Sequence, residues 1–226
     1  MRFLRPFADR RAAGRALARV LAKRKLADPV VLALPRGGVP VAAEIARVLK
    51  APLDIVLVRK IGVPFQPELA AAAVVDGDSP QIVTNADVMA LAGVTRDEIE
   101  AAAKRELEEI ERRRKAYLKD RARVPLEGRT LILVDDGIAT GASIRAAVRG
   151  LRKKQPKMLI LAVPVAPADT VQELRKEVDE VVCLTMPEPF FAIGTHYIDF
   201  HQMSDEEVVE LLAQQEREAS SPGPVS

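Results

Sequence analysis

Two adjacent carboxylates, Asp135 and Asp136, are the residues whose types and spacing point most directly to chemistry. They follow an uninterrupted apolar run at 131–134, which predicts a buried strand that ends at the acid pair. Ligands of open α/β sheets bind in the crevice outside the carboxyl ends of the strands. Carboxylates accept hydrogen bonds, and the vicinal hydroxyl groups of a sugar offer two donors side by side. The acid pair therefore predicts a diol-binding site at one edge of a sheet.

The segment that follows the acid pair has the features of an anion site. Gly137 and Gly141 permit a sharp turn, Thr140 and Ser143 supply hydroxyl groups, and a helical pattern begins where the turn ends. Backbone N–H groups of such a turn, together with a helix N-terminus, bind phosphate groups. A phosphate loop directly beyond a diol-binding pair predicts a ribose 5-phosphate ligand. A helix N-cap region with incidental acids is the alternative, and it does not explain why these features coincide.

Other phosphate and metal motifs do not fit this segment. A Walker A loop requires Gly-Lys followed by Ser or Thr, which the sequence lacks. The dinucleotide fingerprint fails because Gly137 and Gly141 are spaced as Gly-x-x-x-Gly. A phosphatase motif of the Asp-x-Asp type fails because adjacent side chains diverge and cannot share one Mg²⁺ in that way.

The elements that must position this segment alternate between short apolar runs and helical patterns. Continuous apolar runs separated by amphipathic helices indicate a parallel sheet that is covered on both faces. We therefore predict an α/β fold with a Rossmann-like core of about five parallel strands and helices on both faces. The predicted strands are 30–34, 54–58, 131–134, 158–163 and 180–184.

Two segments interrupt this alternation. Residues 61–81 are rich in Pro, Gly and Ala without a clear period, which predicts a long loop of a kind that is usually functional. Thr95 and Glu98 then form a capping box that begins a highly charged helix ending near residue 121. Its narrow apolar stripe is typical of a helix clamped along one side, as in a lid or a subunit contact. A homodimer is therefore one expected assembly.

We predict a single domain over residues 1–219. Its core spans about 30–184, with a charged helical insertion at about 85–122 and a C-terminal hood at about 185–213. The terminal segment 220–226 contains two prolines and a glycine and is expected to be disordered.

The basic N-terminal segment has a helical pattern. Ala13, Ala16, Leu17 and Val20 recur at i, i+3, i+4 and i+7, which predicts an amphipathic helix that packs on a core. A transit peptide or a membrane-surface helix is the alternative, but basic amphipathic helices occur in many globular domains.

Composition excludes several classes of function. Lys and Arg number 34 against 32 Asp and Glu, and this balance argues against a nucleic-acid-binding protein. The longest uncharged apolar run, 158–168, contains two prolines and is too short to cross a bilayer. The single cysteine excludes an internal disulfide and no cleavable signal is visible, so we expect a soluble cytoplasmic protein. Abundant charge and proline fit heat adaptation, although a GC-rich coding bias produces the same skew.

Residues 134–143, VDDGIATGAS, closely resemble the phosphoribosyl-pyrophosphate (PRPP) signature of type I phosphoribosyltransferases. The likeness extends over about 30–184, where the order of the other elements agrees with that family. It implies that Asp135 and Asp136 bind the ribose hydroxyl groups of PRPP. It also implies that the 5-phosphate is cradled by Ala139, Thr140, Gly141, Ala142 and Ser143.

The resemblance assigns a pyrophosphate loop to Arg36, Gly37 and Gly38, which follow the first predicted strand. Glycines let the backbone approach a bulky anion, and an arginine supplies a forked charge. A plain turn is the alternative for these three residues taken alone.

Candidate catalytic residues come from the next strand and the segment after it. Arg59 and Lys60 end the predicted strand, where the family often keeps a basic residue that reaches the pyrophosphate. A solvated strand end is the alternative. The 61–81 loop takes the place of the family's mobile catalytic loop and contains Glu68 as a candidate acid. Mg²⁺ is implied as a cofactor bound mainly through PRPP, so no metal-ligating residues of the protein are expected.

Two features of the sequence bear on which acceptor the implied reaction uses. The 6-oxopurine members of the family carry an Asp where this sequence has Ala139, which counts against a hypoxanthine–guanine enzyme. Aromatic residues gather near the C-terminus, where Phe190, Phe191 and Tyr197 are candidates to stack on a nucleobase. The alternative for this cluster is a small satellite core that holds the C-terminal helix.

The resemblance implies a PRPP-dependent phosphoribosyltransferase of nucleotide metabolism. Such an enzyme transfers 5-phosphoribosyl to a nucleobase or a similar nitrogen nucleophile and releases pyrophosphate. The alternative is a PRPP-binding regulatory protein on the same fold without transferase activity. The expected partners are small molecules, with no nucleic acid and no membrane.

Overall fold

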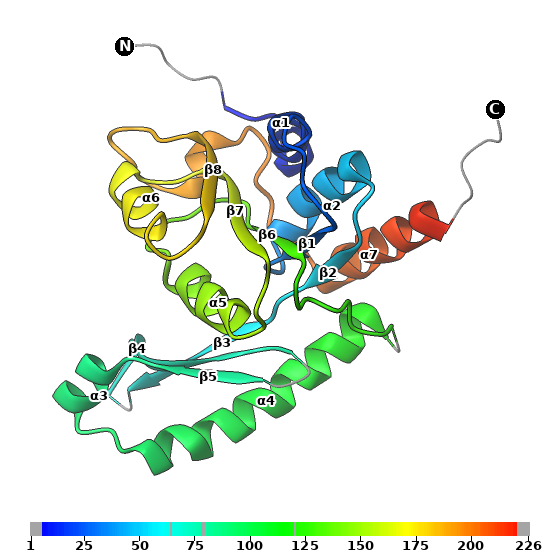
Figure 1. Ribbon diagram of the computed structural model, residues 1–226. Helices are drawn as coiled ribbons and strands as arrows, with labels where there is room; N and C mark the ends of the chain where they lie inside the picture. Colours follow the sequence, from blue (N-terminus) through cyan, green and yellow to red (C-terminus); the bar gives the residue numbers. More distant parts are fainter. Residues whose placement is uncertain (1–5, 64, 78–79, 120, 221–226) are drawn as a thin grey trace, which may run out of the picture.

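The main sheet of the protein has five parallel strands in the order β2-β1-β6-β7-β8 (Figure 1). The structure, a computed structural model, describes residues 6–63, 65–77, 80–119 and 121–220. This sheet confirms the predicted α/β fold. Its strands are β1 (Pro29–Ala33), β2 (Leu53–Ile55), β6 (Thr130–Val134), β7 (Met158–Val165) and β8 (Glu180–Thr185).

Helices cover both faces of this sheet, as predicted (Figure 1). One face packs on α1 (Arg10–Leu21), α2 (Gly38–Leu49) and α7 (Asp205–Ser220), and the other on α5 (Ala142–Arg152) and α6 (Ala168–Leu174). Successive side chains of a strand point to opposite faces, so an uninterrupted apolar run supplies both cores. Across the sheet, one aligned row is Val31, Ile132 and Ile160, and the next row is Leu32, Leu133 and Leu161.

The prediction of a long loop at 61–81 is wrong, because most of this segment belongs to a second, antiparallel sheet with the strand order β3-β4-β5. Residues 71–75 are all buried, since a helix covers each face of this sheet, α4 on one side and α5 on the other (Figure 1). A strand buried on both faces shows no apolar–polar alternation, and alanine has low β propensity. The elements are β3 (Val58–Val63), β4 (Gln66–Val75), β5 (Gln81–Thr84) and α4 (Arg96–Leu118).

The strand predicted at 54–58 is two elements. The chain leaves the parallel sheet after Ile55, and Val58 begins antiparallel pairing opposite Val75. Arg59 and Lys60 therefore lie within β3 and not at the end of a parallel strand, which corrects the prediction. A continuous apolar run cannot distinguish one strand from two that belong to different sheets.

The charged helix α4 begins as predicted. The Thr95 side chain accepts a hydrogen bond from the Glu98 N–H, and Glu98 Oε2 accepts one from the Thr95 N–H at 2.8 Å. A short helix, α3 (Ala86–Ala92), precedes it. The apolar stripe of α4 is buried as predicted at Ile99, Ala103, Ile110 and Tyr117.

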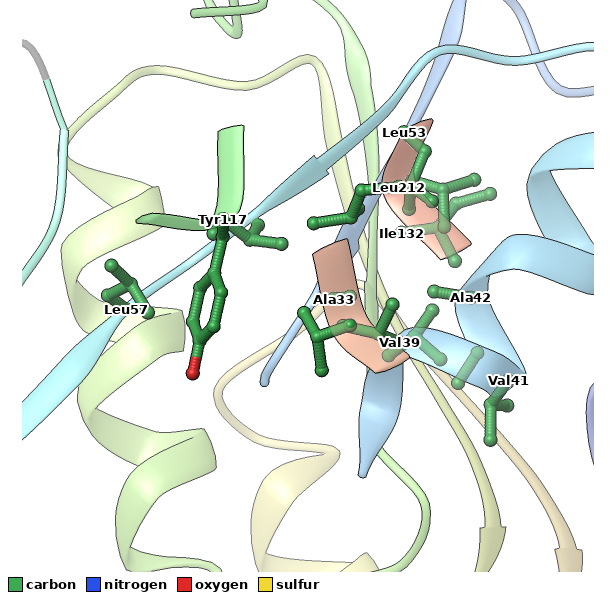
Figure 2. Close-up of a cluster of buried hydrophobic side chains, with 14 of the residues drawn as sticks. Ala33, Val39, Val41, Ala42, Leu53, Leu57, Tyr117, Ile132 and Leu212 are labelled. Carbon is green, nitrogen blue, oxygen red and sulfur yellow. The ribbon is translucent and has the colours of Figure 1, made fainter. Parts of the chain in front are cut away.

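The C-terminal helix α7 joins the core of the main sheet. Figure 2 shows Leu212 of α7 and Tyr117 of α4 in the same buried cluster as Val39 of α2. The Tyr117 hydroxyl donates a hydrogen bond to Asp205 Oδ1 at 2.7 Å, in the first turn of α7. The helix runs to Ser220, one residue into the segment predicted to be disordered, and residues 221–226 lie outside the described residues.

The predicted N-terminal amphipathic helix is α1. Asp9 caps it by accepting a hydrogen bond from the Ala12 N–H at 2.6 Å. Ala13 and Leu17 are fully buried, whereas Ala16 is only half-buried. Among the described helices, none is long and apolar enough to span a membrane.

Candidate functional site

The acid pair and the Arg36-Gly37-Gly38 turn meet at the carboxyl edge of the main sheet. β1 and β6 are neighbours, and the Leu34 N–H, just beyond β1, donates a hydrogen bond at 2.9 Å to the carbonyl of Val134, the last residue of β6. The turn after β1 therefore lies beside the acids after β6. The predicted ribose and pyrophosphate residues are thus brought together.

Glycine is required in this turn because the acid pair leaves no room for a side chain. A Cβ atom at Gly37 would lie 2.1 Å from Asp136 Oδ2. A Cβ atom at Gly38 would lie 2.7 Å from the Val134 carbonyl oxygen. Helix α2 begins at Gly38 at this edge, where the Gly38 N–H donates a hydrogen bond to the Leu34 carbonyl at 3.0 Å and the Val39 N–H donates one to the Arg36 carbonyl at 3.2 Å.

The predicted phosphate loop lies at the N-terminus of α5. Gly141 has a φ of 75°, in the left-handed region that favours glycine, and forms the N-cap of the helix. Ala139, Thr140 and Ala142 are exposed, so the loop is accessible to a ligand. The Thr170 hydroxyl donates a hydrogen bond to the Ala139 carbonyl at 3.4 Å. The geometry is that of an open anion site at a helix N-terminus.

Arg10 of α1 contacts the acid pair, and sequence reasoning missed it. Its Nε donates a hydrogen bond to Asp136 Oδ2 at 2.7 Å, and both side chains are buried. The contact joins residues 126 positions apart, which no local pattern reveals. The available signal was spacing, since Arg10 precedes Ala13 and Leu17 by three and seven residues and so shares their buried face.

The surroundings shift the protonation of both carboxylates. Burial raises the pKa of Asp135 well above its usual range, and the adjacent Asp136 carboxylate raises that pKa further. Burial also raises the pKa of Asp136, against the opposing effect of the Arg10 guanidinium. The Tyr197 hydroxyl donates a hydrogen bond to the Asp136 backbone carbonyl at 2.6 Å and so holds the turn that carries the pair.

A pocket of about 130 Å³ lies between Asp135 and the second sheet. Its lining includes Pro35, Arg59, Asp135 and Ser143, together with Arg113 of α4, which was not predicted. Arg59 is held by Glu106 of α4, with Nε 2.7 Å from Oε2.

Lys60, a second candidate catalytic residue, does not line this pocket. Lys60 is exposed on β3, where side chains of consecutive residues point to opposite faces. It therefore points away from Arg59. Glu68 belongs to β4, but its side chain lies outside the described part of the structure.

The three candidate aromatic residues differ in exposure. Tyr197 is only 6% exposed, and its ring packs between Phe7 and Phe200 at centroid distances of 5.6 and 5.0 Å. A buried ring offers no face to a nucleobase. The prediction that Tyr197 stacks on a base is therefore wrong, and Tyr197 belongs instead to the small satellite core that was the alternative. Phe191 is 80% exposed, and Phe190 is half-buried against His196.

The hood lies directly on the acid turn. A Cβ atom at Gly137 would lie 2.6 Å from Ile193 Cγ2, in the 3₁₀ helix Ile193–His196. The segment that carries the exposed aromatic ring therefore borders the acid pair and the phosphate loop.

Comparisons with known proteins identify the family of the chain. The sequence model of the phosphoribosyl transferase domain family matches residues 7–199. The chain belongs to this family. The match includes the acid pair, the turn after β1 and the phosphate loop.

Individual relatives within the phosphoribosyl transferase domain family extend the comparison. Two provisionally named phosphoribosyl transferases of Mycobacterium tuberculosis, MT0597 (strain CDC 1551) and Rv0571c (strain H37Rv), are each 45% identical over 219 residues. The match covers 97% of this chain, which spans about half (49%) of their length. The crystal structure of TT1426 from Thermus thermophilus is 41% identical, with a TM-score of 0.82, over 94% of this chain and 99% of that one.

Magnesium is the ion whose chemistry fits the donor groups at this edge. Mg²⁺ keeps several waters and binds proteins through one or two carboxylates together with substrate phosphates. Asp135 and Asp136 are such a pair. Within the described residues, no group of three or more His, Cys, Asp and Glu side chains could hold a metal by itself.

Proposed function

We propose that the chain transfers 5-phosphoribosyl from PRPP to a nitrogen nucleophile such as a nucleobase and releases pyrophosphate. The proposal is carried by the contact between the Gly37 turn and the acid pair, next to an open phosphate loop. Each part of PRPP then has a place. The 5-phosphate binds at residues 139–143, the ribose hydroxyl groups at Asp135 and Asp136, and pyrophosphate at residues 36–38.

The reaction requires alignment and charge neutralisation more than proton transfer. An oxocarbenium-like transition state at the anomeric carbon is favoured by fixing the ribose and stabilising the departing pyrophosphate. Arg36 and Arg59 lie near enough to the acid pair to supply positive charge on the pyrophosphate side. Mg²⁺, when bound, neutralises the same leaving group. Lys60 and Glu68 remain candidate catalytic residues. They would contact the ligand if β3 and β4, which carry them, moved toward the acid pair.

The acceptor is expected to be recognised from the hood. Ala139 stands where the 6-oxopurine members of the family carry an Asp, so 6-oxopurines should be poor substrates. Phe191 and Phe190 supply aromatic surface on the segment that borders the acid turn. We therefore expect an acceptor held by stacking and hydrogen bonds.

Calorimetric titration with PRPP and Mg²⁺ tests the site. The Asp135→Asn variant should bind PRPP about 10- to 100-fold more weakly, because it loses a charge-assisted hydrogen bond of about 1.5 to 3 kcal/mol. The matched control is Asp28→Asn, since Asp28 lies at the amino end of β1, at the opposite edge of the sheet. Equal affinity of the two variants would contradict the ribose assignment.

A turnover assay distinguishes the enzyme from a PRPP-binding regulator. Release of pyrophosphate is measured with adenine, hypoxanthine, guanine, uracil and orotate as acceptors. Turnover with one of them supports the transferase, whereas tight PRPP binding without turnover on any acceptor favours the regulator. Efficient use of hypoxanthine or guanine would show that the interpretation of Ala139 is wrong.

A further inference from the structure

Two arginines from different elements line the small pocket beside the acid pair. Arg59 belongs to β3 and Arg113 to α4. Asp135 and Ser143, which the resemblance assigns to the ribose and the 5-phosphate, line the same pocket, and its other lining residues are all apolar. Two cations that face one small space with apolar walls repel each other, and an anion between them removes this repulsion.

Each of the two guanidinium groups is fixed by one carboxylate of α4. Arg59 Nε lies 2.7 Å from Glu106 Oε2, and Arg113 Nε lies 2.7 Å from Glu109 Oε1. Glu106 and Glu109 are three residues apart and are therefore neighbours on the surface of the helix. Hydrogen bonds from Arg112 and Arg113 lower the pKa of Glu109 to about 2, so this anchor stays ionised at neutral pH.

Both anchors use only the Nε–H of the arginine. Within the described residues, the Nη groups of Arg59 and Arg113 have no hydrogen-bond partner. A guanidinium group is a rigid fork that can donate two parallel hydrogen bonds to one phosphate. Two arginines that are held at Nε and border one pocket therefore have the chemistry of a phosphate-binding clamp.

The size and the place of the pocket indicate which part of a ligand it takes. Pockets for whole small molecules occupy about 300 to 1,000 Å³, whereas this one occupies about 130 Å³ and suits a single charged group. Pro35, the residue before the predicted pyrophosphate turn, also lines it. Burial raises the pKa of Tyr117 to about 12 against the opposing charges of Arg113 and Arg36, so both cations lie near this hydroxyl group.

We propose that Arg113 is a pyrophosphate-binding residue, which forms with Arg59 a two-arginine clamp on the leaving group of PRPP. When the bond between the anomeric carbon and the pyrophosphate oxygen breaks, its electron pair stays on that oxygen, and the clamp stabilises the charge that develops there. The inference rests on the proposed function, because it assigns this pocket to the diphosphate end of PRPP. It adds to that function a residue of α4, outside both the signature segment and the turn after β1.

The test compares Arg113→Met with Arg112→Met. Arg112 pairs with the same Glu109 at 2.7 Å, but it is 68% exposed and does not line the pocket. Binding of pyrophosphate in the presence of Mg²⁺ is measured calorimetrically. R113M should bind pyrophosphate about tenfold or more weakly, the loss expected for one charge-assisted hydrogen bond. R112M should match the wild type, and equal affinities of R113M and R112M would overturn the inference.

A second ligand separates a contact with pyrophosphate from a general effect on the site. Ribose 5-phosphate lacks the diphosphate, so R113M should bind it as the wild type does. A loss for ribose 5-phosphate as large as the loss for pyrophosphate would overturn the clamp, because Arg113 would then support the whole site. If R113M does not fold, Arg113→Gln replaces it and should show the same selective loss, since glutamine is polar but carries no charge.

Pyrophosphate as a probe also keeps the two proposals apart. Wild-type protein that binds pyrophosphate through Arg113, but neither binds PRPP nor transfers its phosphoribosyl group, would overturn the proposed function and leave the clamp as an anion site. PRPP binding by the wild type with unchanged pyrophosphate affinity in R113M would overturn the clamp and leave the proposed function intact. Wild-type protein that binds no pyrophosphate would also overturn the clamp.

Discussion

Gly37 shows that the candidate site depends on a missing side chain as much as on the carboxylates. The carboxylate of Asp136 fills the space in which a Cβ atom at position 37 would lie. Neither the turn nor the acid can move away easily, because the Leu34–Val134 hydrogen bond joins the two strands just before them. The distance between the predicted pyrophosphate and ribose subsites is therefore fixed.

Substituting Gly37 should disturb this spacing. Gly37→Ala places a methyl group 2.1 Å from Asp136 Oδ2, so the turn must shift. We expect a loss of about 1 to 3 kcal/mol in stability from overpacking, and weaker PRPP binding. Urea denaturation and calorimetry measure the two effects.

Gly93→Ala is the matched control for this substitution. Gly93 has a φ of 64° and no atom within 4 Å of its ideal Cβ position, so the variant strains the backbone without crowding a site. Its PRPP affinity should be unchanged. Unimpaired binding by G37A would contradict the fixed spacing.

At this scale the sequence was informative where a residue acts with its neighbours along the chain. The acids, the glycines and the phosphate loop are readable because one short segment contains them all. Arg10 was harder to identify, since its partner is distant in sequence and only its spacing from Ala13 and Leu17 indicates that it shares the buried face of the helix. The prediction that Tyr197 stacks on a base was wrong, because the sequence does not distinguish an aromatic residue that stacks on a ligand from one that packs on Phe200.

Among the elements, α4 holds the second sheet to the first through buried charges. Arg114 of α4 contacts Asp54 at 3.0 Å and Asp76 at 2.8 Å, and all three side chains are buried. Asp54 lies in β2, and Asp76 directly follows β4. One side chain therefore connects both sheets.

Removing this arginine should be strongly destabilising. Arg114→Met leaves Asp54 and Asp76 buried with less compensation, which is expected to lower the free energy of unfolding by about 3 to 5 kcal/mol. Arg112→Met, on the exposed side of the same helix, should change it by less than about 1 kcal/mol. Chemical denaturation of both variants measures the difference, and similar losses would contradict the connecting role of Arg114.

The hood gives a prediction about the acceptor. Phe191→Ala should weaken binding of the preferred base by about 1 to 3 kcal/mol, the contribution of one base stacked on an aromatic ring. PRPP affinity should hardly change, because the phosphate loop belongs to another element. Ile198→Ala, which removes a 75% exposed apolar side chain from the same hood, is the control. Unchanged base binding in F191A would contradict base stacking and would support the alternative that the aromatic cluster only packs as a satellite core.

Elements were predictable where an apolar run is continuous or where an end carries a signal. The parallel strands and the capped start of α4 follow from such patterns. The second sheet does not, because β4 is rich in alanine, and the low β propensity of alanine hides a strand that is covered on both faces. Its interpretation as a loop followed directly from the absence of any period.

For the molecule as a whole, the acid pair is expected to lower stability. The pKa of Asp135 is raised on folding above the value of about 3.9 in an unfolded chain. The folded state then binds the proton more tightly, so the free energy of unfolding falls as the pH rises from about 4 through the raised pKa. Removing the group removes this loss.

The Asp135→Asn variant should therefore become increasingly more stable than the wild type as the pH rises, even as it loses PRPP affinity. Asp179→Asn should show the opposite trend, because hydrogen bonds from Arg152 and the Leu159 N–H lower the pKa of Asp179 despite some burial. Urea denaturation between about pH 2 and about pH 8 gives both differences, because the lowered pKa of Asp179 confines its change in stability to the range below about pH 5. A D135N difference that shrinks with rising pH would contradict the assigned environment of the pair.

Helix α5 joins the predicted phosphate loop to the second sheet. The loop lies at its N-terminus, and near its other end Gly150 packs against Val75 of β4, where a Cβ atom at position 150 would lie 2.6 Å from Val75 Cγ1. In evolutionary terms, positions 75 and 150 constrain each other, since a larger side chain at one requires a smaller one at the other. A larger side chain at either position would push on the helix that carries the predicted phosphate loop. Position 75 of the second sheet is therefore one whose substitution we expect to affect that loop.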